Sequence, residues 1–158
     1  MIGFLDGKPP RAFAHRGWHV GKLAGLENSM AAFRLAFDEG YRYLETDVRL
    51  TGDGNLIAFH DARLDRVTDR PGLVSALPWR DIQQARIGGT EPIPLMADLL
   101  DAFPTALFNI DAKSDAAAAP LVDLVMTSGS AARVCLWSFS DRRLAAIRAA
   151  CGPEVATS

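Results

Sequence analysis

Short apolar runs of strand length alternate along the chain with longer segments that have helical periodicity. The apolar runs are Arg11–His15, Tyr41–Val48, Asn55–His60, Ala106–Asp111 and Arg133–Phe139. Apolar residues recur every three or four positions in Asn28–Glu39, Leu95–Phe103, Asp115–Ser128 and Asp141–Cys151, as in helices with one buried face. Strands that alternate with helices predict βα units and a mostly parallel sheet.

The number of predicted strands limits the choice of α/β architecture. After Gly152 and Pro153, the last residues, Glu154–Ser158, look like the beginning of a further strand. A closed (β/α)8 barrel needs eight strands and typically ~250 residues. The 158 residues supply about five complete strands. The pattern therefore predicts either an open sheet or a single domain, residues 1–158, that is the N-terminal ~two-thirds of a barrel.

Composition and charge exclude several functional classes. The formal net charge is −2, so no whole-chain field favours nucleic acid or an anionic membrane. No stretch approaches the ~18 apolar residues of a membrane span, and the first residues lack the pattern of a secretory signal. We therefore expect a cytoplasmic protein without a transmembrane segment, in which Cys135 and Cys151 are reduced, buried thiols.

Two acidic residues stand two positions apart in the second apolar run. Glu45 and Asp47 project to the same face of a strand, because side chains alternate between its two faces. Two adjacent carboxylates repel each other, and a divalent cation such as Mg²⁺ or Ca²⁺ would remove that cost. The alternative is an edge strand with a solvated acidic face. This pair alone leaves both interpretations open.

A second strand favours the binding-site interpretation. Asn109, Asp111 and Lys113 share one face of the Ala106–Asp111 run and its continuation, and such groups are costly on an inner face without partners. Asp111 is a candidate third metal ligand, and Lys113 is a candidate partner of a phosphate. The alternative is an exposed Asp111–Lys113 ion pair.

Two histidines come at the ends of predicted strands, where active-site residues of parallel α/β folds collect. His15 and His60 are candidate general acid and base, since imidazole exchanges protons near neutral pH. Arg16, next to His15, offers a planar fork to phosphate oxygens. A satisfied structural histidine is the alternative for either one alone.

The residues Glu27 and Asn28 precede the first predicted helix. Asn28 alone is sufficiently explained as the N-cap of that helix, with its side chain accepting a backbone N–H. Glu27 is a candidate to face the metal or the substrate. Together with Asn28 and Asn109, it is expected to support the site.

The order of these motifs resembles the glycerophosphodiester phosphodiesterase family. The resemblance rests on His15-Arg16-Gly17, Glu27-Asn28, Glu45-x-Asp47, His60-Asp61, Asn109–Lys113 and Ser138-Phe139, and it runs from about Arg11 to Phe139. It implies a TIM barrel of the phospholipase-C-like phosphodiesterase type and a divalent metal, Mg²⁺ or Ca²⁺. The implied metal ligands are Glu45, Asp47 and Asp111, the implied acid and base are His15 and His60, and the implied phosphate ligands are Arg16 and Lys113.

The resemblance also implies a reaction and two departures from the family. The glycerol 2-hydroxyl would attack phosphorus and release an alcohol, and water would open the cyclic phosphate to glycerol 3-phosphate. The first departure is Asp111, where the family usually has the longer Glu. The second is the C-terminal portion of the barrel, for which this sequence has no counterpart. The expected partner is a small glycerophosphodiester.

The connection between the second and third apolar runs poses a question of topology. Residues 50–55 have the composition of a tight hairpin turn, which would reverse the chain. The family's shared site requires His60 and Glu45 at one end of the sheet. We therefore predict an extended return over residues 49–55 and a strand Asn55–His60 that is parallel to the preceding one. A distance above ~15 Å between His60 and Asp47 would contradict the shared site.

Two further functions remain open. A sphingomyelinase-type phospholipase or lyase on the same fold would use a similar pair of histidines and metal-binding acids. A non-catalytic fragment or binding module would keep the ligands without a complete pocket.

Overall fold

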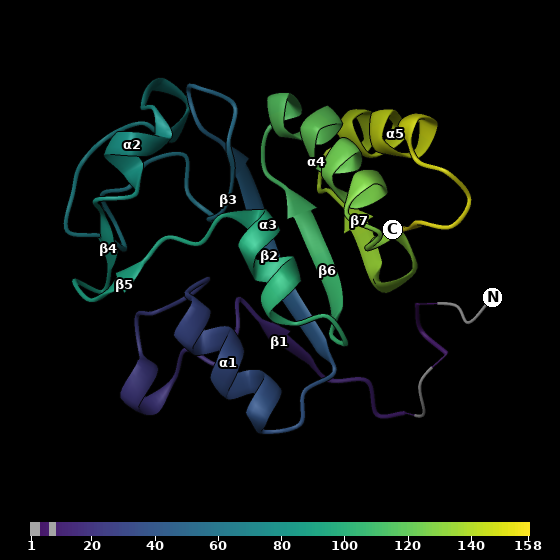
Figure 1. The fold of residues 1–158 in the computed structure, drawn as a ribbon, viewed down its shortest axis with the longest axis horizontal. Helices are drawn as coiled ribbons and strands as arrows, with labels where there is room; N and C mark the ends of the chain where they lie inside the picture. The colour runs from purple at the N-terminus through teal and green to yellow at the C-terminus, as the bar shows by residue number, and fades with distance from the viewer. Residues whose placement is uncertain (1–3, 7–8) are drawn as a thin grey trace.

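The protein is built around a six-stranded sheet in a computed structural model that describes residues 4–6 and 9–158 (Figure 1). Five strands are parallel in the order β1-β2-β6-β7-β8, and β3 pairs with β2 from outside this path. The strands are β1 (Phe13–His15), β2 (Tyr43–Leu50), β3 (Leu56–Ala58), β6 (Leu107–Ala112), β7 (Val134–Trp137) and β8 (Ala156–Thr157).

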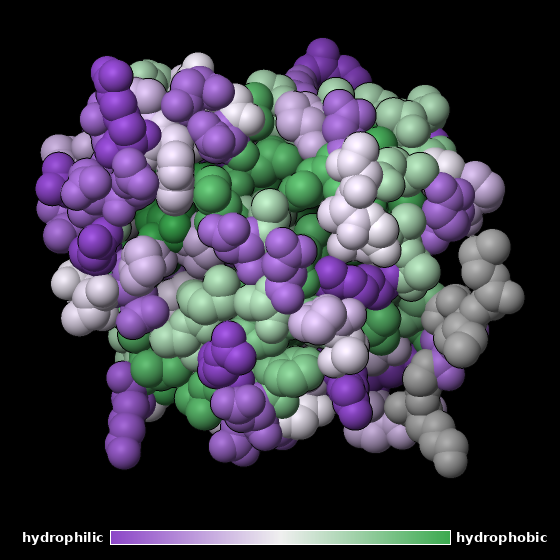
Figure 2. Space-filling model, in the orientation of Figure 1, coloured by the Kyte–Doolittle hydropathy of each residue, from purple (hydrophilic) through white to green (hydrophobic). Residues whose placement is uncertain are grey.

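Helices connect the parallel strands, as the alternating pattern predicted. They are α1 (Met30–Asp38), α3 (Met96–Ala102), α4 (Asp115–Thr127) and α5 (Asp141–Ala150), with 3-10 turns at Gly21–Leu23, Val74–Ala76 and Ala131–Arg133. Figure 2, in the same orientation as Figure 1, shows hydrophilic side chains over the outer parts of this face and hydrophobic side chains between them.

Alternation along the strands gives the sheet one apolar face and one polar face. Leu44 and Val48 of β2, together with Phe108 and Ile110 of β6, are fully buried in a core shared with the helices. Because neighbouring residues point to opposite sides of a strand, the carboxylates of these strands lie on the other face. The hydrophobic pattern thus places the helices and the chemistry on opposite sides of the sheet.

The long connection from residue 61 to residue 94 forms a small lobe with its own core. It holds α2 (Trp79–Ile82) and a hairpin of β4 (Arg86–Ile87) and β5 (Glu91–Pro92), on the left of Figure 1 with α2 uppermost. Its buried residues include Leu64, Val74, Ile82 and Ile87, which pack with Phe59 from the end of β3. This second core fixes the lobe against the sheet.

The predicted direction of the third strand is wrong. β3 pairs antiparallel with β2, with Leu50 opposite Leu56 and Val48 opposite Ala58. The hairpin turn between them is closed by the Thr51 N–H, which donates to the Asn55 carbonyl at 2.9 Å. Local turn chemistry therefore decides the topology of this connection.

Two further expectations concern the burial of the cysteines and the absence of a membrane span. Cys135 and Cys151 are free thiols, but only Cys135 is buried. Among the described residues, no helix has the length and apolar character needed to cross a membrane.

Candidate active site

Three carboxylates lie buried on the polar face of the two central strands. Glu45 and Asp47 lie on β2 and Asp111 lies on β6, and the exposed fraction of each residue is 6% or less. The strand register sets Asp47 opposite Asp111 and Glu45 opposite Asn109. The predicted shared face is therefore present, and the carboxylates are buried rather than solvated.

Two cations partly neutralise this cluster. Lys113 places Nζ 2.5 Å from Asp111 Oδ2 and 3.0 Å from Asp47 Oδ1. Arg16 places Nε 2.9 Å from Asp47 Oδ2, and its backbone N–H donates to Glu45 Oε2 at 3.1 Å. The Asp111–Lys113 pair considered from the sequence exists, but it is buried among further charges. The predicted phosphate ligands thus lie beside the predicted metal ligands.

The turn after β1 is strained where it enters the site. Arg16 has φ of 56°, in the left-handed region that non-glycine residues rarely occupy. Gly17 follows with φ of 79°, and a Cβ atom there would lie 2.7 Å from the Ala32 carbonyl carbon. The turn therefore brings the chain against α1, and Arg16 is aimed at the carboxylates.

The N-cap interpretation of Asn28 is wrong. Ser29 caps α1, because its side chain accepts from the Ala32 N–H at 3.1 Å. Asn28, with φ of 59°, instead donates from Nδ2 to Asp47 Oδ2 at 3.1 Å and accepts from Thr46 Oγ1 at 2.9 Å. Its side chain points into the sheet and holds Asp47 in place.

The cluster retains an excess of negative charge. Burial, followed by the charge of Asp47, raises the pKa of Glu45 to about 7. Asp111 Oδ1 is buried and has no hydrogen-bond partner among the residues that the structure describes. No three His, Cys, Asp or Glu side chains in the described part of the chain converge closely enough to hold a metal ion as they lie here. The hard oxygen donors and the unpartnered oxygen nevertheless fit a divalent cation.

His15 lies at the edge of this cluster. Its Nε2 is 3.8 Å from Glu45 Oε2, while its side chain is 66% exposed. Partial burial and the neighbouring Arg16 charge lower the pKa of His15. The ring of His19 lies 6.5 Å from the His15 ring.

His60 reaches the same region despite the reversed strand. The N–H of Phe59 donates to the Asp47 carbonyl at 2.9 Å, and Arg49 Nε donates to the His60 carbonyl at 2.7 Å. β2 continues three residues beyond Asp47 before the hairpin, so the return strand comes back to the level of the carboxylates. The two histidines therefore share one end of the sheet, as expected.

A chain of charged groups links His60 to Arg16. His60 Nδ1 lies 2.6 Å from Asp61 Oδ1, and Arg66 contacts both Asp61 and Glu27. Glu27 in turn pairs with Arg16 at 3.0 Å. Hydrogen bonds from Arg66 lower the pKa of Asp61 to about 2, and hydrogen bonds and charge from Arg66 and Arg16 lower that of Glu27 despite its burial.

Some residues of the site had no assigned role in the sequence analysis. Thr46 supports Asn28, Arg49 holds the backbone at His60, and Arg66 joins two carboxylates. Of the three, only Arg66 carries a signal in the sequence, because it stands in the long connection of residues 61–94, and connections of that length are often functional. Asn109, predicted to support the site, is half-buried opposite Glu45.

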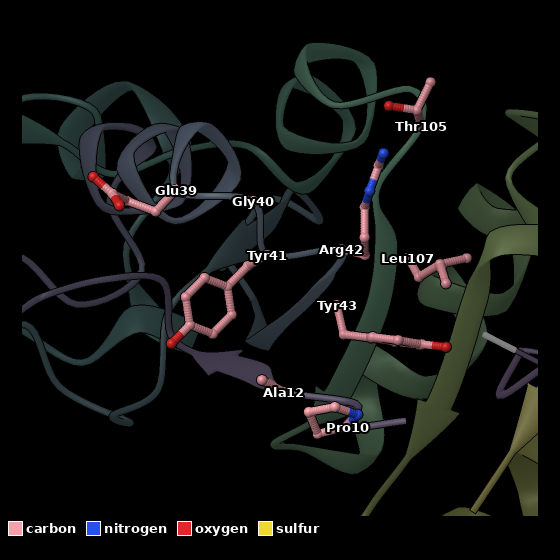
Figure 3. Close-up of a pocket in the computed structure, with 9 residues that line it drawn as sticks. All are labelled: Pro10, Ala12, Glu39, Gly40, Tyr41, Arg42, Tyr43, Thr105 and Leu107. Carbon is pink, nitrogen blue, oxygen red and sulfur yellow. The ribbon is translucent and has the colours of Figure 1, made fainter. Parts of the chain in front are cut away.

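A cavity of about 490 Å³ lies at the other end of the strands. Arg42 and Thr105 lie on one side of it and Pro10 and Ala12 on the other (Figure 3). Tyr43, the first residue of β2, also lines it. In barrel enzymes the reaction takes place at the carboxyl ends of the strands. The carboxylate cluster, rather than this cavity, is thus the candidate active site.

Comparison with known proteins agrees with this geometry. The model of the glycerophosphoryl diester phosphodiesterase family matches residues 15–149, which include the whole carboxylate cluster and both histidines. The chain belongs to this family. It is 42% identical over 132 residues to a Mycobacterium tuberculosis protein described as probable glycerophosphodiester phosphodiesterase 2, a match that covers 84% of this chain and 49% of that protein.

Solved structures of the family share the fold. A glycerophosphodiester phosphodiesterase from Agrobacterium tumefaciens matches with a TM-score of 0.81 and 28% identity, over 92% of this chain and 64% of that one. An Oleispira antarctica phosphodiesterase in complex with the product sn-glycerol-3-phosphate matches with a TM-score of 0.80 and 27% identity, over 94% and 64%. The predicted TIM-barrel fold is confirmed, and the chain spans about half of the M. tuberculosis relative.

Proposed function

We propose that the chain carries the active site of a metal-dependent glycerophosphodiester phosphodiesterase, which cleaves glycerophosphodiesters to an alcohol and glycerol 3-phosphate. The observation that carries the proposal is the placement of three buried carboxylates, His15 and His60 at one end of the sheet. The family match and the relative bound to sn-glycerol-3-phosphate support this substrate class.

Glu45, Asp47 and Asp111 are the proposed ligands of a divalent cation, Mg²⁺ or Ca²⁺. A bound cation would act as a Lewis acid that stabilises the charge on the phosphate oxygens. The unpartnered Asp111 Oδ1 and the raised pKa of Glu45 support this assignment, because both mark unbalanced negative charge. With the carboxylates neutralised in this way, Arg16 and Lys113 are available to pair with the phosphate.

His15 and His60 are the proposed acid and base. One imidazole would take the proton of the glycerol 2-hydroxyl as it attacks phosphorus, and the other would protonate the leaving alcohol. A cyclic phosphate would result, and the same two groups would exchange roles when water opens it. The lowered pKa of His15 favours the neutral ring and hence the role of base. Glu27, Asn28 and Asn109 are proposed to support these groups.

An assay of glycerophosphocholine hydrolysis tests the proposal. Release of glycerol 3-phosphate by the purified chain should require Mg²⁺ or Ca²⁺, stop with EDTA, and fall by at least about 100-fold in His15→Ala and His60→Ala. His19→Ala is the matched control and should retain activity, because none of the interactions found among the described residues joins His19 to the carboxylates. A chain that binds divalent metal but hydrolyses no diester would favour the binding-module alternative.

A substrate panel separates the proposal from the sphingomyelinase-type alternative. Glycerophosphocholine, lysophosphatidylcholine and sphingomyelin share the choline phosphate and differ in the group that carries it. The proposed attack by the glycerol 2-hydroxyl requires a free hydroxyl on the carbon next to the one that carries the phosphate. Faster turnover of sphingomyelin than of glycerophosphocholine would refute the substrate assignment.

A further inference from the structure

Arg66 is the side chain of the lobe at residues 61–94 that joins the two histidine-bearing segments. Its Nε and Nη2 donate to Asp61 Oδ2 and Oδ1 at 2.6 and 3.1 Å. Its Nη1 and Nη2 donate to Glu27 Oε2 and Oε1 at 3.0 and 2.7 Å. One guanidinium thus makes paired contacts with two carboxylates, each from a different part of the chain. Such two-pronged pairing fixes orientation as well as charge.

The backbone around Arg66 is held in place by the second core. Leu64 is buried, and its N–H donates to the Gly72 carbonyl at 2.9 Å. Thr68 donates from Oγ1 to the Leu64 carbonyl at 2.9 Å. Asp65 accepts from the Gly72 N–H at 3.0 Å. The loop is therefore braced on both sides of Arg66, so the guanidinium is presented to the site by a rigid support.

The contact between Asp61 and His60 defines which nitrogen of the imidazole can react. A carboxylate only accepts hydrogen bonds, and the hydrogen bonds from Arg66 lower the pKa of Asp61 to about 2, so this group is ionised at neutral pH. The His60 Nδ1 atom, 2.6 Å from Asp61 Oδ1, must then carry the proton. Nε2 is then the nitrogen of His60 that is left to exchange a proton with the substrate.

We propose that Arg66 is a positioning residue that fixes the orientation and tautomer of His60 through Asp61 and couples them to Arg16 through Glu27. This inference rests on the proposed function for its catalytic consequence. Arg66 makes no contact with the carboxylates Glu45, Asp47 or Asp111 among the described interactions, so its role differs from that of the proposed metal ligands. It extends the site into the lobe, which supplies both Asp61 and Arg66 to this relay.

The matched control lies in the same loop. Arg63 pairs with Asp65 at 3.0 Å, and its side chain is 58% exposed, while Arg66 is 50% exposed. Arg63→Gln and Arg66→Gln therefore remove the same guanidinium from similar surroundings, and only Arg66→Gln breaks the connection to Asp61. We expect Arg66→Gln to lower kcat for glycerophosphocholine by roughly 10- to 100-fold, with KM changed less than about threefold, as for other groups that orient a catalytic side chain.

A spectroscopic measurement tests the inference without an assay of enzymatic activity. The chain contains three histidines, so ¹⁵N spectra of the histidine-labelled protein at about pH 8 contain three ring patterns, and His60→Asn assigns that of His60. The wild type and Arg63→Gln should show His60 protonated at Nδ1. Arg66→Gln should show a mixture of tautomers, and guanidinium ions added to Arg66→Ala should restore the wild-type pattern and rate.

The possible outcomes separate this inference from the proposed function. A shifted tautomer in Arg66→Gln alone supports the positioning role even where the wild type hydrolyses no diester, in which case only the proposed function fails. An unchanged His60 pattern in a folded Arg66→Gln overturns the inference, as does a rise in KM with kcat unchanged. Where circular dichroism shows that the Arg66 variants do not fold, Asp61→Asn decides: it must change the His60 tautomer, and a wild-type pattern would overturn the role.

Discussion

Replacing Glu45 by Gln tests whether the site is built at the expense of stability. In the folded protein the pKa of Glu45 is about 7, against 4.5 for an unperturbed glutamate, because of burial and of the charge of Asp47. Each pKa unit corresponds to about 1.4 kcal/mol, so ionised Glu45 disfavours the folded state by about 3 kcal/mol. Gln keeps the side-chain shape and can still accept the Arg16 N–H, but it carries no charge.

The sign of the effect depends on pH. Below pH 4.5 Glu45 is protonated in both the folded and the unfolded chain, so it does not change the free energy of unfolding. Between pH 4.5 and about 7 only the unfolded chain ionises, and the free energy of unfolding falls by about 1.4 kcal/mol per pH unit. Above pH 7 Glu45 is ionised in both states, and the folded state carries the full cost of the buried charge. The free energy of unfolding of Glu45→Gln should therefore match that of the wild type near pH 4 and exceed it by about 3 kcal/mol at pH 8.

Urea unfolding followed by circular dichroism, in EDTA at pH 4, 6 and 8, measures this difference. Glu39→Gln, which changes the same group at an exposed position, is the control. Millimolar Mg²⁺ or Ca²⁺ should then stabilise the wild type more than Glu45→Gln, since a ligand of the folded state raises its stability. A Glu45→Gln protein that is no more stable than the wild type at pH 8 would refute the reasoning.

Three further substitutions test the framework around the site. Gly17→Ala should lower the thermal midpoint more than Gly25→Ala, because both glycines have positive φ but only at Gly17 would a Cβ meet neighbouring atoms. Ser29→Ala should cost about 1 kcal/mol in urea unfolding, since it removes the cap of α1, and an unchanged midpoint would contradict the capping assignment. Phe103→Ala should cost about 3–5 kcal/mol, because this ring is buried in the main core, and a loss below about 1 kcal/mol would show that the core does not pack as described.

The shared face of Glu45 and Asp47 could be predicted from the sequence because it depends on strand periodicity alone. Glu45 and Asp47 are two residues apart, and alternation puts both on one face wherever the strand lies in the sheet. The strand bounds were also close, with Tyr41–Val48 predicted and Tyr43–Leu50 observed. Asp111 joined them because β6 pairs with β2 in a register that sets Asp111 opposite Asp47. The hydrophobic pattern of either strand does not specify that register.

The contacts that the sequence did not reveal depend on tertiary structure. Asn28 looked like a cap because it precedes a helix and has a suitable side chain. Its positive φ and its contact with Asp47 follow from the way the loop packs on β2. Arg66 lies 39 residues from Glu27, and only the packing of the lobe on the sheet brings the two together. Neither contact leaves a periodic pattern in the sequence.

The hairpin between β2 and β3 explains how a local rule and a distant requirement are both satisfied. The turn residues predict a reversal of the chain, whereas the shared site predicts a parallel strand, because a reversed strand would carry His60 away from Glu45. The two predictions conflict only if β2 ends at Asp47, within the site. β2 instead continues from Asp47 to Leu50, and the return from Leu56 brings Phe59 back beside Asp47. The extra length of β2 therefore sets the position of His60, so lengthening the turn should be tolerated better than shortening this extension.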